Sequence, residues 1–181
     1  MPVDKPFAAA AEENKQPILE VIEPLFQGLR TVLEIGSGTG QHAVFFAARI
    51  PHLLWQTSDL PDNHAGIRAW IADTGVANVL PPLALDVTGA WPPGPYDAVF
   101  SANTAHILSS DQVAAMFRGV ARVLAPAGLF ALYGPFNYGG HYTSESNARF
   151  DQSLRARYPA SGLKNVEDLE VMARAGGMEL S

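Results

Sequence analysis

The chain has 181 residues, of which 48% are hydrophobic and 17% charged, and it contains no cysteine. This length fits one domain with a substantial core, and the composition excludes a chain kept disordered by charge and low hydrophobicity. Twelve basic and eighteen acidic side chains give a net charge of −6 at pH 7, which argues against nucleic acid as an electrostatic partner. The lack of cysteine excludes disulfides, thiolate metal sites and a cysteine nucleophile.

The amino-terminal residues and the hydropathy pattern bear on localisation. No apolar run follows a basic start in residues 1–7, as it would in a signal peptide. No window approaches the roughly 18 consecutive apolar residues of a membrane-spanning helix. We therefore expect a cytoplasmic protein with neither a membrane nor a nucleic acid as its partner.

Short apolar runs alternate with helical patterns along the chain, which is typical of strand–helix–strand units. A helical segment is predicted within residues 1–28, with Pro17 in its first turn. Buried strands are then predicted near residues 31–35, 53–59, 79–85, 96–101 and 129–133. Further helices are predicted over residues 41–50, 62–75 and 109–124, through Phe150 and Leu154, and from Asn165 to Gly176.

Local signals refine these elements. Asp62 and Asn165 are expected to cap the helices that follow them, and Ser109 with Gln112 forms the pattern of a capping box. The two prolines at 81–82 predict that the third strand is short or lies at an edge of the sheet.

The order of these elements predicts a doubly wound, mainly parallel Rossmann-like α/β sheet in one domain over residues 1–181. The chain ends at Ser181, where a sixth strand would only begin, so the last strands of such a sheet are expected to be missing. The strand near 129–133 would then be an exposed edge with unpaired backbone groups. We expect either that the chain is truncated or that another chain, such as a second copy in a homodimer, covers this edge.

The strongest motif is the turn Gly36-Ser37-Gly38-Thr39-Gly40, which lies between a predicted strand and a predicted helix and follows Glu34. Glycines at such a turn allow positive φ and let a ligand approach the backbone closely. A dinucleotide fingerprint would place its third glycine at position 41, which is Gln41. The spacing therefore favours a ligand without phosphates, and the alternative is a tight turn with incidental glycines.

Acidic residues end the second and third predicted strands. Asp59 can accept both hydrogens of a ribose diol, and the alternative is a solvated loop acid or a helix cap. Asp86 can accept from an exocyclic amino group while the N–H of Val87 meets a ring nitrogen, as proteins often read adenine. The alternative for Asp86 is an Asx-turn into residues 88–89.

The segment Ser101-Ala102-Asn103-Thr104-Ala105-His106 follows the fourth strand. In an open parallel sheet the ligand crevice lies at the carboxyl ends of the strands, where the strand order reverses. His106 could take a proton there, because histidine titrates near neutral pH. The alternative is a histidine that packs at the entry of a helix.

A glycine-rich polar stretch follows the fifth strand and is predicted to be part of a lid over residues 134–160. The glycines at 139–140 could act as a hinge, and tyrosines nearby could shield a substrate from water. His141 and Glu145 form a second candidate acid/base pair. The alternative is an ordinary surface loop.

Together these motifs resemble the class I S-adenosylmethionine-dependent methyltransferases. The chain also resembles a bacterial family of domains of unknown function that has a mammalian methyltransferase-like relative. The segments that carry the narrower resemblance are residues 13–19, 34–42, 101–103, 133–137 and 143–147. The resemblance implies that Gly36, Gly38 and Gly40 border the methionine part of the cofactor, Asp59 its ribose and Asp86 its adenine. The residues expected around the cofactor are Glu34, Gly36, Ser37, Gly38, Gly40, Asp59, Leu60, Asp86, Val87, Ser101 and Asn103.

We therefore predict methyl transfer from S-adenosylmethionine to a small-molecule acceptor by direct displacement, with His106 and His141 as catalytic candidates. A general base is needed for an alcohol or a protonated amine, but not for a thiolate or an acidic phenol. No metal is expected, because the five histidines are scattered without ligand spacing. The alternatives are a non-catalytic cofactor-binding module that acts through a partner chain and, less favoured, a nicotinamide-dependent oxidoreductase.

Overall fold

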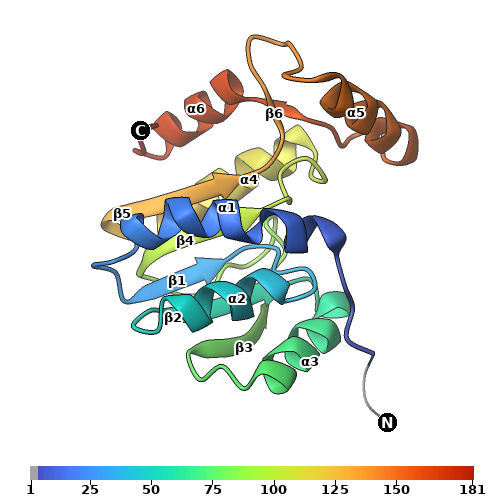
Figure 1. The fold of residues 1–181 in the computed structure, drawn as a ribbon. Helices are drawn as coiled ribbons and strands as arrows, with labels where there is room; N and C mark the ends of the chain where they lie inside the picture. The colour runs from blue at the N-terminus through green and yellow to red at the C-terminus, as the bar shows by residue number, and fades with distance from the viewer. Residues whose placement is uncertain (1–3) are drawn as a thin grey trace.

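Five parallel strands form the central sheet of the computed structural model, which describes residues 4–181 (Figure 1). Their order across the sheet is β3, β2, β1, β4, β5. The strands are β1 (Thr31–Glu34), β2 (Leu54–Asp59), β3 (Val79–Ala84), β4 (Tyr96–Ala102) and β5 (Leu124–Tyr133). The predicted strands are confirmed, and their order is that of a doubly wound Rossmann-like sheet.

Helices cover both faces of the sheet (Figure 1). One face carries α1 (Ala9–Leu25), α2 (Gln41–Arg49) and α3 (His64–Thr74), and the other carries α4 (Ser110–Val123) and α6 (Val166–Ala175). The helix α5 (Glu145–Arg157) accompanies the short strands β6 (Phe136–Asn137) and β7 (Lys164–Asn165). Among the helices of residues 4–181, none is both long and apolar enough to cross a membrane.

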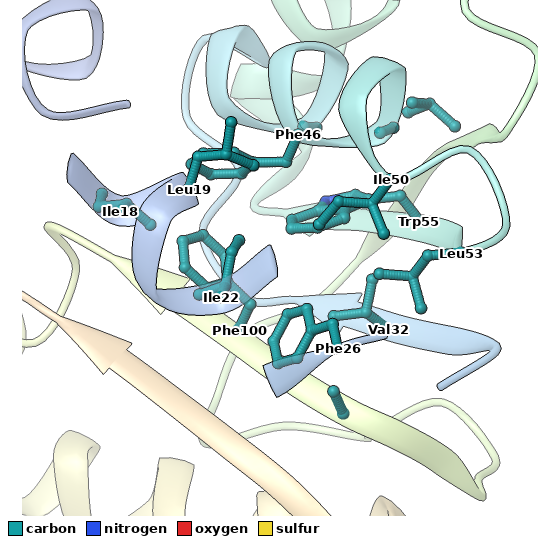
Figure 2. Packing of buried hydrophobic residues seen from close by; sticks show 14 of the residues in the cluster. Ile18, Leu19, Ile22, Phe26, Val32, Phe46, Ile50, Leu53, Trp55 and Phe100 are labelled. Carbon is teal, nitrogen blue, oxygen red and sulfur yellow. The ribbon is translucent and has the colours of Figure 1, made fainter. Parts of the chain in front are cut away.

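The core divides into two clusters because successive strand residues point to opposite faces. Val32 of β1 packs with α1 and α2, and its neighbour Leu33 packs with α4. In the first cluster the rings of Phe46, Trp55 and Phe100 contact one another, with centroids 5.5–5.6 Å apart (Figure 2). Burial of one such side chain contributes about 1.5–3 kcal/mol, so this cluster fixes α2 against the sheet.

The first helix begins earlier than predicted. It starts at Ala9, so Pro17 lies in its interior and not in its first turn. Pro17 has no N–H for the helical ladder, which removes one backbone hydrogen bond. Ile18, Leu19 and Ile22 are nevertheless buried against the first cluster, and this packing carries the helix past the proline (Figure 2).

The predicted capping box at the start of α4 is confirmed. The N–H of Gln112 donates to Ser109 Oγ at 3.2 Å, and the N–H of Ser109 donates to Gln112 Oε1 at 2.9 Å. These reciprocal bonds satisfy two backbone donors at the start of the helix. They fix where the chain turns into α4 after the loop that carries His106.

Two other predicted caps are wrong in detail. Asp62 lies inside a 3₁₀ turn, η1 (Pro61–Asn63), and α3 begins after it at His64 without a side-chain cap. Asn165 does precede α6 as predicted. Its side chain, however, donates to Asp168 Oδ2 at 3.1 Å and accepts from no backbone N–H of the helix.

The strands at the two edges of the described sheet are β3 and β5, as predicted. Within residues 4–181, β5 pairs only with β4, which leaves its other side without a partner strand. Residues 125–128 form a bulge inside β5. The pairing there jumps from Tyr96 opposite Leu124 to Ala98 opposite Leu129.

The predicted lid region is built from regular elements. The strand β6 pairs in parallel with β7, and α5 lies between them in the chain. A turn closes between Tyr138 and His141, where Gly139 and Gly140 both have positive φ. The region is therefore an ordered unit on the β4–β5 side of the sheet, and its movement as a lid stays a prediction (Figure 1).

Candidate active site

The carboxyl ends of the five strands meet at one edge of the sheet, because all of them run parallel. Ladder pairing places Glu34 at the end of β1 opposite Phe100 of β4, and Ala102 at the end of β4 opposite Tyr133 of β5. The strand order reverses between β1 and β4, where an open sheet forms its ligand crevice. The predicted site residues follow these strand ends.

The three glycines of the turn after β1 have different roles. All three have positive φ, which favours glycine. A Cβ at Gly36 would lie 2.5 Å from Thr104 Oγ1, and a Cβ at Gly40 would lie 3.0 Å from Ile67 Cα. Only at Gly38 would a Cβ meet no atom within 4 Å. Gly36 thus admits the loop after β4, Gly40 admits α3, and Gly38 faces open space, and the contact of these three glycines with a ligand stays a prediction.

The side chains of Glu34, which precedes the turn, and Ser37, which is part of it, support the turn through hydrogen bonds. Both are buried, and Ser37 Oγ donates to Glu34 Oε2 at 2.9 Å. Trp55 Nε1 donates to the same oxygen at 2.9 Å, and Ser37 Oγ accepts from the N–H of Ser58 at 3.1 Å. Burial raises the pKa of Glu34 to about 7, although the hydrogen bonds that Glu34 accepts from Trp55 and Ser37 oppose the shift.

Asp59 joins the end of β2 to the glycine turn. Its Oδ2 accepts from the N–H of Gly38 at 2.7 Å. Its Oδ1 accepts from the N–H of Leu60 at 2.7 Å and from Asn63 Nδ2 at 2.9 Å. The carboxylate is buried, so the alternative of a solvated loop acid is wrong, and the acid predicted to bind ribose lies beside the one glycine that faces open space.

The region after β3 contains the Asx-turn expected as the alternative for Asp86, and the contact of Asp86 with adenine stays a prediction. Its Oδ1 accepts from the N–H and the hydroxyl of Thr88, which forms the Asx-turn and lowers the pKa of Asp86. Its Oδ2 accepts no hydrogen bond from residues 4–181. The N–H of Val87 likewise donates to no acceptor among these residues. Leu60 is 50% exposed at the same edge of the sheet. An acceptor, a donor and an apolar side chain are therefore all available to a planar base.

The two polar residues at the end of β4 differ. Ser101 is fully buried and its hydroxyl donates to the carbonyl of Ile35 at 2.9 Å. It has no surface to offer a ligand, so its predicted contact with the cofactor is corrected to support of the strand end. Asn103 has a φ of +56° and its N–H donates to the carbonyl of Tyr133 at 3.0 Å. A non-glycine residue held in this conformation is common where a site needs a particular side-chain direction.

His106 lies on the loop that follows β4. Its ring packs edge-to-face against Phe150 of α5, with centroids 5.1 Å apart. The side chain is buried, yet its ring nitrogens make no hydrogen bond within residues 4–181 and are not sealed from solvent. Burial and, second, the charge of Lys164 lower the pKa of His106, so the imidazole is neutral at pH 7 and can accept a proton.

The second candidate pair, His141 with Glu145, is not formed. His141 is exposed in the turn with Tyr138, and Glu145 faces Arg149, with 3.7 Å between Oε2 and Nη1. Glu145 is drawn to that neighbour because it occupies the first turn of α5, one helical turn before Arg149. Throughout residues 4–181, no three His, Cys, Asp or Glu side chains gather as a metal site would require.

One group of residues was missed by the sequence reasoning. Gln41 Oε1 accepts from the N–H of Ala8 at 2.6 Å, and His42 Nε2 lies 2.7 Å from Asn14 Oδ1. These contacts fasten the start of α1 to the start of α2, directly after the glycine turn. Burial lowers the pKa of His42 to about 4, so its ring is a neutral structural donor. Their positions within the segments that resemble a known family were the available signal.

The comparison with protein families settles where the chain belongs. A family model described as "Protein of unknown function (DUF938)" matches residues 5–181. The chain belongs to the DUF938 family. This family covers the whole of the site described above, from the start of α1 to the end of α6.

Solved structures show the fold of this DUF938 protein. The S-adenosylmethionine-dependent methyltransferase SibL matches 93% of this chain and 49% of its own, with 24% identity and a TM-score of 0.80. An O-methyltransferase family protein from Burkholderia thailandensis has 19% identity and a TM-score of 0.84, covering 95% and 53% of the two chains. The mitomycin 7-O-methyltransferase MmcR has 16% identity and a TM-score of 0.83, covering 96% and 49%. The DUF938 chain thus has the class I methyltransferase fold and spans about half the length of these proteins.

Proposed function

We propose that this DUF938 protein binds S-adenosylmethionine at the carboxyl ends of β1 to β4 and transfers its methyl group to a small molecule. The observation that carries this proposal is the open space above Gly38, whose N–H is held 2.7 Å from the Asp59 carboxylate. An acid and an unobstructed backbone at this place suit a ribose and its amino-acid extension. The shared fold with a S-adenosylmethionine-dependent methyltransferase supports the same ligand.

The donor set at the edge fits each part of this cofactor. Asp59 Oδ2 accepts only from the N–H of Gly38 and keeps a lone pair for a ribose hydroxyl, whereas Oδ1 already accepts two hydrogen bonds. The turn at Gly38 gives room for the methionine part. The N–H of Val87 and Asp86 Oδ2 match a ring nitrogen and the exocyclic amino group of adenine, with Leu60 against its face. When bound, the cofactor supplies a methyl group on a sulfonium that needs no further activation.

The chain's own task is to hold the acceptor in line and to take its proton. We assign the second task to His106, because its neutral imidazole has no hydrogen-bond partner among residues 4–181 and lies just beyond the end of β4. Oxygen as the accepting atom is supported by the names of the neighbouring folds, two of which are O-methyltransferases. The net charge of −6 supports a small molecule over a polyanion.

Two isosteric substitutions test the cofactor site. We expect Asp59→Asn to weaken binding of S-adenosylhomocysteine by tenfold or more in calorimetry, because a neutral amide accepts weakly from a diol. Asp62→Asn is the matched control, since Asp62 is exposed three residues away and bonds to none of the site residues. Equal affinity of both variants and the wild type would contradict the proposed site.

Activity is tested with labelled S-adenosylmethionine and a panel of phenol, catechol, a primary alcohol, a thiol and an amine. Transfer of label to a hydroxyl is the expected result. Tight binding of S-adenosylhomocysteine without transfer to any member would favour a cofactor-binding module that works through a partner chain. The unpaired side of β5 is the feature that such a partner could use.

A further inference from the structure

Residues 136–165, here called the cap segment, are organised around one buried carboxylate. Asp151 of α5 is 2% exposed and bonds to three separate parts of the segment. Its Oδ1 accepts from the N–H of Leu163 at 2.7 Å. Its Oδ2 accepts from the Tyr142 hydroxyl at 2.6 Å and from Arg155 Nε at 2.9 Å. The glycine-rich loop, α5 and the chain before β7 therefore meet at Asp151.

The same stretch that Asp151 anchors also grips the loop after β4. The N–H of Gly162 donates to the carbonyl of His106 at 2.9 Å. Ser161 Oγ donates to the carbonyl of Ile107 at 2.5 Å, and Lys164 Nζ donates to the carbonyl of Leu108 at 2.6 Å. Three consecutive carbonyls are thus held by Ser161, Gly162 and Lys164, and the Asp151-bound Leu163 lies between the last two.

A second connection runs through side chains. Phe150, the residue before Asp151, packs edge-to-face on the His106 ring. Asp151 therefore holds in place both Phe150, against which the imidazole packs, and the backbone that carries His106.

The packing at Gly162 shows how closely this assembly is fitted. Gly162 has a φ of +143°, and a Cβ there would lie 2.5 Å from the guanidinium carbon of Arg155. Arg155 is held in that place by its bond to Asp151. A side chain at position 162 would displace the guanidinium and disturb the stretch that holds the His106 carbonyl.

We propose that Asp151 is a positioning residue, which orients His106 toward the acceptor by locking the cap segment onto the loop after β4. This inference rests on the proposed function for its catalytic meaning, whereas the coupling itself is a property of the protein without ligand. Asp151 bonds neither to the glycine turn nor to Asp59, so we expect its substitution to leave the binding of cofactor unchanged.

The experiment compares Asp151→Asn with the wild type by the imidazole ¹⁵N signals of His106, assigned from the missing signals of a His106→Asn sample. We expect the His106 signals of Asp151→Asn to shift or broaden. The signals of His52, which lies at the amino ends of the strands, should not move. Asp111→Asn is the matched control, because Asp111 is an exposed carboxylate in α4, outside the cap segment. Unchanged His106 signals in folded Asp151→Asn would overturn the proposal.

Tyr142→Phe keeps the test open if Asp151→Asn does not fold, because it removes one bond to the carboxylate and leaves the charge and the ring in place. We expect a smaller change of the His106 signals in the same sense, and no change would again overturn the proposal. Binding of S-adenosylhomocysteine is measured on the same samples and is expected to stay within twofold of the wild type. Loss of that binding in the wild type would reject the proposed function and leave the coupling to be decided by the His106 signals.

Discussion

The two sides of the carboxyl edge are built in contrasting ways. On the β1–β2 side, backbone groups make much of the site, as in the bond between the N–H of Gly38 and Asp59, which are 21 positions apart. On the β4–β5 side, the cap segment holds the loop of His106 through bonds between residues more than 50 positions apart. The first arrangement depends on glycine conformations, and the second depends on one buried carboxylate. Substitutions should therefore separate binding of the cofactor from handling of the acceptor.

The largest expected effect is on the acceptor side. His106→Asn should lower the rate of methyl transfer by about 10²-fold or more, because it removes the group proposed to take the proton. The affinity for S-adenosylhomocysteine should remain within twofold. His52→Asn is the control, since that ring lies at the amino ends of the strands, near the carbonyl of Phe26. A parallel loss of rate and affinity in His106→Asn would remove the division between the two sides.

The next effect belongs to the cofactor side. Gly38→Ala should weaken binding of S-adenosylhomocysteine by tenfold or more, because the methyl group enters the open space beside Asp59. Gly75→Ala is a close control: Gly75 has a φ of +63° against +59° at Gly38, and its Cβ would also meet nothing within 4 Å. Both variants should lose a similar stability, about 1–2 kcal/mol, in urea unfolding. Equal affinities of the two variants would show that the space at Gly38 is not a ligand site.

A pH dependence should sharpen the same contrast. Burial raises the pKa of Glu34 to about 7 in the unliganded protein. The stabilisation that protonated Glu34 contributes to the folded state is therefore fully present at a pH below the ordinary pKa of a glutamate. That contribution is lost as the pH rises through 7, by about 1 kcal/mol between pH 6 and 8. We expect the ammonium group of bound S-adenosylhomocysteine to lie near Glu34 and to favour its ionised form, so the affinity should rise up to tenfold over the same range. Glu34→Gln should flatten both slopes in urea unfolding and calorimetry, and retained slopes would assign them to another group.

A separate effect, on stability alone, concerns the joint between α1 and α2. Asn14→Ala leaves the buried Nε2 of His42 without its partner and should cost about 1–3 kcal/mol in unfolding free energy. The control Gln16→Ala removes only an exposed contact of 3.4 Å to Glu20. Asn14→Ala should alter the structure of the cofactor side more than that of the cap segment. Equal unfolding free energies of Asn14→Ala and Gln16→Ala would contradict a structural role for this joint.

The same contrast explains what could be predicted from the sequence. The glycine turn, Asp59 and the strand order follow from local patterns, because a strand, a tight turn and a helix leave a signature within ten residues. The different roles of Gly38 and Gly40, and the burial of Ser101, depend on which helix or strand packs nearby. The role of Asp151 had no local signal, because its partners come from three segments that only the fold brings together.

The most direct test of the proposed function is calorimetric titration of residues 1–181 with S-adenosylhomocysteine and, in parallel, with NAD⁺. The account predicts binding of S-adenosylhomocysteine with a Kd on the order of micromolar, near −8 kcal/mol, and no heat from the dinucleotide. No heat from S-adenosylhomocysteine, or equal binding of NAD⁺, would contradict it.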